Sequence, residues 1–161
     1  MRIKENENKV LYSEKLKTFS AAHPCEEVTV DGARFRYILC GSAGGKTLVF
    51  LNGGMNTLEM WMDYVDALAD TGRVLLFDYP QQLRTNQAPV RGMHAFFAAL
   101  KGKILLILPD QDFFSGQMQQ DLIRLMHEPE IRYVSGGHLS TVLKTEDYIR
   151  TIREFLAGQP D

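Results

Sequence analysis

The sequence has few cysteines, little net charge and no long apolar run, and each absence excludes a class of protein. The two cysteines, Cys25 and Cys40, match no metal-ligand spacing, so we interpret them as free buried thiols rather than as a disulfide. A formal net charge of −2 gives no electrostatic reason to expect a nucleic acid or a membrane as partner. No apolar run approaches the roughly 20 residues that cross a bilayer, and the polar start, Met1 to Lys9, is not a signal peptide. A soluble cytoplasmic protein is expected.

The remaining composition is that of a folded domain. Hydrophobic residues make up 45% and charged residues 24% of the 161 residues, which is normal for a globular protein. The chain has no repeat, low-complexity tract or linker that would divide it. We therefore expect one domain over residues 1–161, with a helical extension at 1–25 and a core at 26–157.

The first part of the chain predicts a helix followed by a hairpin. Apolar residues recur near helical spacing over roughly residues 8–21, and Pro24 ends this helix. Two short strands are expected at 27–30 and 34–39. The Asp-Gly dipeptide between them is a strong hairpin signal, because both turn positions favour positive φ.

From Lys46 onward, continuous apolar runs alternate with amphipathic helices. The expected strands cover residues 47–51, 73–77, 103–108 and 131–134. The expected helices run from Leu58 to Leu68 with Asn56 as N-cap, from Val90 to Lys101, after an N-cap at Ser115, and from Thr145 to a stop at Gly158. Such alternation favours a parallel sheet with helices on both faces. The predicted fold is a three-layer α/β domain with a mostly parallel six-stranded sheet and the antiparallel N-terminal hairpin at one edge.

Polar and glycine residues follow the expected strands at the points where they end. In such sheets, ligands bind at the carboxyl ends of the strands, where loops from different strands converge. Those ends carry Asn52-Gly53-Gly54, Asp78-Tyr79-Pro80, Pro109-Asp110-Gln111-Asp112 and Gly136-Gly137-His138. We expect all of these segments on one rim of the sheet.

Taken in order, these segments resemble the α/β-hydrolase family. Residues 48–55, with Trp61 after them, resemble its first parallel strand, oxyanion loop and following helix, and residues 73–80 resemble the next strand and its Asp-x-Pro turn. Residues 104–112 resemble the strand and loop that deliver the catalytic acid. The histidine loop is matched by residues 136–138. The resemblance covers roughly residues 26–157.

The resemblance implies roles for residues on the rim. His138 would be a general base, and Asp112 would orient its imidazole. The oxyanion-hole candidates are the backbone N–H groups of Gly53, Gly54 and Met55, although a strand-to-helix turn alone would also require glycine here. The residues expected to line the cleft are Asn52, Trp61, Asp78 and Tyr79. Asp78 is also interpreted as a turn or helix-cap acceptor. No cofactor and no metal is implied.

The sequence departs from the family at the nucleophile. No Gly-x-Ser-x-Gly, and no cysteine or aspartate version with both glycines, occurs in the chain. Ser135 and Ser140 lie on the histidine's own loop. The helix at 90–101 runs through Gly102 straight into the acid-bearing strand, where the family continues into its nucleophile strand. We expect a shortened form that lacks the nucleophile-elbow strand, the next helix and strand, and any cap; natural loss and engineering would both give this pattern.

Three interpretations follow from the missing nucleophile. The first is a minimal hydrolase scaffold with little or no activity, in which Asp112 and His138 are vestigial. The second is a hydrolase of esters or carbon–halogen bonds, in which Asp110 or Asp112 is a carboxylate nucleophile and His138 activates water. The third is a homodimer formed through the surface that the missing segment uncovers, or a module that binds a small apolar ligand or ester.

Overall fold

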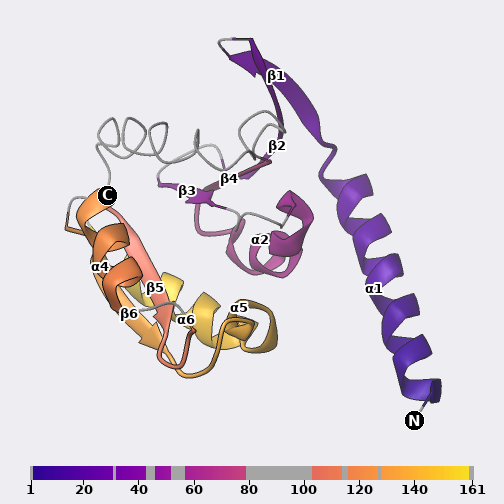
Figure 1. The fold of residues 1–161 in the computed structure, drawn as a ribbon. Helices are drawn as coiled ribbons and strands as arrows, with labels where there is room; N and C mark the ends of the chain where they lie inside the picture. The colour runs from indigo at the N-terminus through magenta and orange to yellow at the C-terminus, as the bar shows by residue number, and fades with distance from the viewer. Residues whose placement is uncertain are drawn as a thin grey trace. The chain divides into compact units, whose positions relative to one another are not determined.

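The computed structural model describes residues 2–30, 32–42, 46–51, 57–78, 103–113, 116–126 and 128–159 (Figure 1). The chain forms two compact units, residues 1–82 and residues 83–161. Each unit is described by itself.

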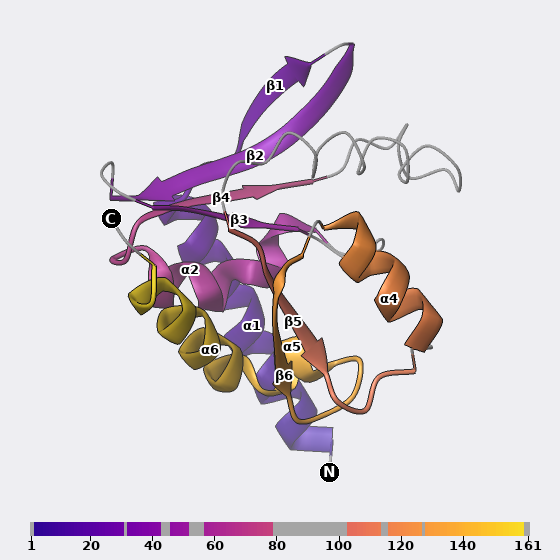
Figure 2. The same ribbon diagram turned by 90° about the vertical axis from the view of Figure 1, so that its left-hand side faces the viewer.

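The first unit contains a four-stranded mixed sheet. Its elements are α1 (Arg2–Ala22), β1 (Glu26–Val30), β2 (Ala33–Gly41), β3 (Thr47–Phe50), the 3₁₀ helix η1 (Leu58–Trp61), α2 (Met62–Leu68) and β4 (Arg73–Phe77). The strand order is β1-β2-β4-β3. β1 and β2 form an antiparallel hairpin, β2 pairs antiparallel with β4, and β3 pairs parallel with β4. The hairpin therefore lies at the edge of the sheet, as the sequence predicts (Figure 2).

The core of the first unit lies on one face of this sheet. Alternate residues of a strand point to the same face, and the inward residues of β2 and β4 meet apolar side chains from α1, η1 and α2. The buried members of this cluster are Phe19, Ile38, Leu58, Met62, Val65, Val74 and Leu76. Full burial of a side chain of this size contributes about 1.5–3 kcal/mol. On the opposite face, Leu39 of β2 is 52% exposed.

Two glycines allow the end of β2 to approach the turn before β4. Gly41 has a φ of +85°, a region that favours glycine, and a Cβ added to it would lie 2.2 Å from the carbonyl oxygen of Gly72. A Cβ on Gly72 would lie 2.4 Å from the carbonyl oxygen of Lys46. The backbone N–H of Ser42 donates to Gly72, and that of Arg73 donates to Lys46. Side chains at both glycines are therefore excluded by the hydrogen-bonded backbone itself.

The second unit contains a two-stranded parallel sheet. Its elements are β5 (Leu105–Pro109), α4 (Gly116–Leu125), β6 (Glu130–Val134), α5 (Ser140–Leu143) and α6 (Thr145–Ala157). β5 and β6 pair in register, with Pro109 opposite Val134. Helices α4 and α6 lie on opposite sides of this pair (Figures 1 and 2). The helix α6 packs on both strands and buries Tyr148, Ile149, Ile152 and Phe155, as the predicted apolar stripe requires.

Three sequence predictions about packing need correction. The strands of the described residues form sheets of four and two strands, not one six-stranded sheet. The strand predicted at 47–51 is not buried on both faces, because the described helices of its unit cover one face only; Thr47 and Val49 are exposed. Both cysteines are free, but Cys25 is exposed and Cys40 only partly buried, so the prediction of two buried thiols is wrong.

The boundaries of several helices also differ from prediction. The helix predicted at 8–21 begins at Arg2. The helix predicted from Leu58 begins with the 3₁₀ turn η1, which has Thr57 in the N-cap position without a side-chain cap. The short helix α5 was not predicted. The predicted cap Asn56, the predicted helix at 90–101 and the predicted cap Ser115 lie outside the described residues.

Candidate functional site

The loops after β5 and β6 emerge side by side in the second unit. The two strands are parallel and end at paired residues, Pro109 and Val134, so the segments that follow them start at the same edge of the sheet. The pairing continues past the strands, since the backbone N–H of Asp110 donates to Val134 at 3.1 Å and that of Gln111 donates to Gly136 at 2.9 Å. The prediction that strand ends share a rim therefore holds for the ends of β5 and β6.

Asp110 binds the backbone of the neighbouring loop. Its Oδ1 accepts a hydrogen bond from the backbone N–H of Gly136 at 2.8 Å. Gly136 has a φ of +140°, a conformation that glycine adopts far more easily than other residues. The carboxylate of Asp110 thus fixes the turn that leads to His138.

Asp112 and His138 are in contact. The Nδ1 of His138 lies 3.2 Å from Oδ1 and 3.4 Å from Oδ2 of Asp112. The Asp112 side chain is 7% exposed and the His138 side chain 46% exposed. The ring of Phe113 lies against the imidazole, with 4.4 Å between centroids and 43° between planes. A buried carboxylate on Nδ1 orients an imidazole so that Nε2 can take up a proton, which is the arrangement of a general base and its orienting acid.

The hydroxyl of Ser140, which is two residues beyond His138, is held by another partner. Its Oγ lies 2.8 Å from the phenol oxygen of Tyr148, and both side chains are buried. Burial raises the pKa of Tyr148, the bond to Ser140 opposes this, and the charge of Asp112 raises it further. The Ser140 hydroxyl is therefore engaged with a phenol in the protein interior, not displayed as a nucleophile.

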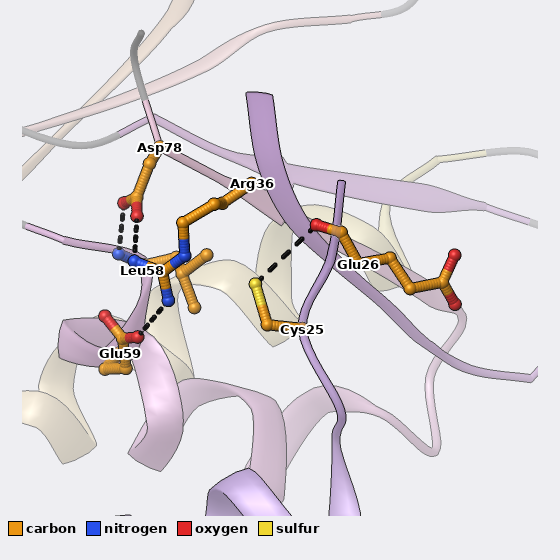
Figure 3. A network of polar contacts seen from close by, with 6 residues as sticks. All are labelled: Cys25, Glu26, Arg36, Leu58, Glu59 and Asp78. Carbon is orange, nitrogen blue, oxygen red and sulfur yellow. Dashed lines mark hydrogen bonds and ion pairs between the residues drawn. The ribbon is translucent and has the colours of Figure 1, made fainter. Parts of the chain in front are cut away.

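In the first unit, Asp78 anchors the start of η1 (Figure 3). Its Oδ1 accepts the backbone N–H of Leu58 at 2.7 Å, and its Oδ2 accepts Nη1 of Arg36 at 2.9 Å. The Nη2 of Arg36 donates to Glu59 at 2.8 Å. Cys25 lies beside this network, and its thiol donates to the carbonyl of Glu26 at 3.7 Å. Asp78 thus accepts one of the N–H groups that a helix start leaves without an intrahelical partner.

The predicted site residues fall in both units. Asp110, Asp112 and His138 belong to the second unit, and Trp61 and Asp78 belong to the first. Trp61 packs against aromatic rings, with centroid distances of 5.0 Å to Phe50 and 5.1 Å to Tyr64. The predicted residues that lie outside the described ones are Asn52, Gly53, Gly54, Met55 and Tyr79. Their roles stay predictions.

Sequence reasoning missed the partners of two polar side chains. Tyr148 lies among the buried apolar residues of α6, but its hydroxyl bond to Ser140 was not predicted. A tyrosine within a buried stripe needs a partner for its hydroxyl, and that signal was present in the sequence. Arg36 was not singled out, because its two carboxylate partners are distant in sequence.

No metal-binding cluster of three or more His, Cys, Asp or Glu side chains is present among the described residues. Within the same part of the chain, no helix has both the length and the apolar character that crossing a membrane requires.

Two solved structures resemble the chain over most of its length. A predicted CIB-like hydrolase from Thermoplasma acidophilum aligns with a TM-score of 0.60 at 13% identity, over 85% of this chain and 99% of its own. A carboxylesterase from Bacillus subtilis aligns with a TM-score of 0.61 at 12% identity, over 96% of this chain and 100% of its own. Both have the α/β-hydrolase fold, so the likeness supports that fold for this chain.

Other comparisons add no further support. A haloalkane dehalogenase from Agrobacterium tumefaciens C58 aligns with a TM-score of only 0.42 at 22% identity, over 71% of this chain and 42% of its own, which is too weak to support an inference. No protein-family model and no curated protein matches the sequence.

Proposed function

We propose that this chain is a minimal α/β-hydrolase scaffold that keeps the acid–histidine pair and has little or no hydrolase activity. The observation that carries the proposal is the Asp112–His138 contact at 3.2 Å in a sequence without a nucleophile elbow. The solved structures of hydrolases support the scaffold through their fold.

The missing nucleophile accounts for the proposed lack of activity. In acyl transfer, the histidine deprotonates a serine or cysteine that then forms the covalent intermediate. Removing that nucleophile from a catalytic triad lowers kcat on the order of a million-fold. His138 and Asp112 alone can assist only a water molecule. The hydroxyl nearest to His138 in sequence, Ser140, is buried against Tyr148, which supports the absence of a substitute.

The shortened form belongs to the same proposal. In the sequence, a single helical stripe separates the strand at 73–77 from the acid-bearing strand, whereas the family places its nucleophile strand between them. Loss of that strand, its helix, the following strand and any cap as one block accounts for this pattern. It also removes the segments that shape substrate specificity.

The carboxylate-nucleophile alternative has no contact in its favour. Asp112 faces the imidazole, as an orienting acid does, and Asp110 accepts a backbone N–H from the next loop. Binding of a small apolar ligand or ester, and a homodimer, stay predictions, since none of the contacts described above bears on them.

The test is labelling with a fluorophosphonate together with a panel of activated esters. We expect no stoichiometric label on any serine, and ester turnover that is the same for the parent and for His138→Ala. The matched control is His23→Ala, which removes a histidine of the first unit whose ring contacts Phe19. Stoichiometric labelling of a serine, or turnover that His138→Ala abolishes and His23→Ala preserves, would overturn the proposal.

A further inference from the structure

The loop that carries His138 is held at both ends. At its start, Gly136 exchanges hydrogen bonds with the other loop: its N–H donates to Asp110 and its carbonyl accepts from Gln111. At its end, the backbone N–H of Ser140 donates to the carbonyl of Gly137 at 2.9 Å, closing a turn around His138. The position of His138 therefore depends on where Ser140 is fixed.

Ser140 is fixed by Tyr148 of α6. The two oxygens lie 2.8 Å apart, and the residues are only 3% and 4% exposed. Water has little access to this buried pair, so neither hydroxyl can easily exchange its partner for a water molecule. The bond is also directional. The helix α6 thus holds the Ser140 side chain at the end of the His138 loop through a buried hydrogen bond, while the backbone N–H of Lys144 donates to the Ser140 carbonyl.

Tyr148 also lies within the electrostatic reach of Asp112. Burial is the main cause that raises the pKa of the phenol, and the negative charge of Asp112 raises it as well. The same residue of α6 is therefore bonded to the loop of the histidine and near the carboxylate of the acid. The contact through which Tyr148 can fix the loop is its hydrogen bond to Ser140.

The Asp112–His138 contact is sensitive to small displacements. N–H···O hydrogen bonds in proteins span about 2.7–3.2 Å, and the two Nδ1–carboxylate distances are 3.2 and 3.4 Å. A small movement of His138 away from Asp112 would break the bond. An ionised carboxylate accepts hydrogen bonds and donates none, so a neutral imidazole that faces it must carry its proton on Nδ1.

We propose that Ser140 and Tyr148 are positioning residues, whose buried hydrogen bond holds His138 against Asp112 and fixes the neutral imidazole as its Nδ1–H tautomer. This inference rests on the proposed function in one respect only: it concerns the same acid–histidine pair. The inference adds the contact that keeps Asp112 and His138 together. It requires no turnover, so it can be tested in a protein without activity.

The experiment measures the ¹⁵N chemical shifts of the His138 imidazole in the whole chain, at a pH where the ring is neutral. The signals are assigned by their loss in His138→Gln. Asp112→Ala defines the tautomer ratio of a ring without its acceptor. We expect Tyr148→Phe and Ser140→Ala each to move the ratio toward that reference, lowering the Nδ1–H to Nε2–H ratio by more than about twofold. The double variant should shift no further than either single one, because one bond is lost in all three.

The control is Tyr133→Phe, which removes a phenol hydroxyl from an exposed side chain of β6 in the same unit and should keep the parental shifts. Far-UV circular dichroism checks folding; if Tyr148→Phe fails to fold, Ser140→Ala decides. Parental shifts in Ser140→Ala, with a change in Asp112→Ala, would overturn the positioning role and leave the proposed function intact. Parental shifts in Asp112→Ala would overturn the pair itself, and the positioning role with it. Ester turnover bears only on the proposed function.

Discussion

Asp78→Ala should destabilise the first unit more than any loss of a surface carboxylate. The substitution removes the acceptor of the Leu58 N–H, which lies at 2.7 Å in a buried setting, and one of the two carboxylate partners of Arg36. Leu58 is itself fully buried in the core cluster. Loss of this hydrogen bond therefore disturbs the start of η1, where Leu58 packs into the core.

The magnitude follows from the two bonds. A buried backbone N–H without an acceptor costs about 1–3 kcal/mol. The ion pair adds at most about 1 kcal/mol, because the Arg36 side chain is 43% exposed and solvent screens it. The expected loss for Asp78→Ala is therefore about 1–4 kcal/mol. Asp78→Asn keeps an oxygen for Leu58 but turns an amide toward the guanidinium, so we expect about 1–2 kcal/mol.

The assay is urea unfolding followed by the fluorescence of Trp61, the single tryptophan of the chain, which packs beside Phe50 and Tyr64. Glu59→Gln is the matched control, because it removes the other carboxylate of Arg36 and leaves the Leu58 bond. We expect the order of destabilisation to be Asp78→Ala, then Asp78→Asn, then Glu59→Gln. A loss below about 0.5 kcal/mol for Asp78→Ala, or equal losses for the two Asp78 variants, would refute the reasoning.

Three further predictions concern the first unit. Gly41→Ala should destabilise the first unit by more than about 2 kcal/mol in urea unfolding. Gly32→Ala is the control, because Gly32 also has positive φ but nothing lies within 4 Å of the added Cβ, and it should destabilise by about 1 kcal/mol. Equal losses of unfolding free energy for the two variants would contradict the backbone clash at Gly41. Burial favours a higher pKa for Glu59, but hydrogen bonds from Thr57 and from the guanidinium beside it outweigh burial and hold its pKa below the ordinary 4.5. The stabilisation by ionised Glu59 is therefore present above pH 4.5 and is lost as the pH falls through the lower pKa that Glu59 has in the folded state. The difference in unfolding free energy between the parent and Glu59→Gln should vanish on acidification. A difference that grows instead would contradict the direction of the pKa shift. Iodoacetamide should alkylate exposed Cys25 well before Cys40, whose pKa is raised by burial and by a nearby aspartate; equal rates by mass spectrometry would contradict this.

The strands could be predicted because their signals are local. The strand at 73–77 is apolar from Val74 onward and lies between Gly72 and Asp78, and the observed β4 has the predicted bounds. The hairpin of β1 and β2 was marked by its Asp-Gly turn. The division into sheets of four and two strands was not predicted, because strand pairing depends on contacts between distant segments that periodicity does not encode.

The contacts of the candidate site were harder to predict than its residues. The Asp112–His138 contact joins residues 26 positions apart, and only the family resemblance indicated it. The Asp78–Leu58 bond spans 20 positions, whereas capping rules look for an acceptor within the first turn. Asn56 has a side chain of the type that caps helices and precedes the apolar stripe in the sequence, so the capping rules pointed to it and not to Asp78, which follows β4.

Two carboxylates at the ends of strands show why burial alone does not identify a catalytic residue here. The side chains of Asp78 and Asp112 are almost equally buried, at 9% and 7% exposure. Asp78 faces a backbone N–H and a guanidinium, and neither group releases a proton near neutral pH. Asp112 faces an imidazole, the side chain whose protonation changes in that range. The two sites therefore differ in what their partners can exchange, and it is the imidazole of His138 that makes Asp112, and not Asp78, a candidate for proton-transfer chemistry.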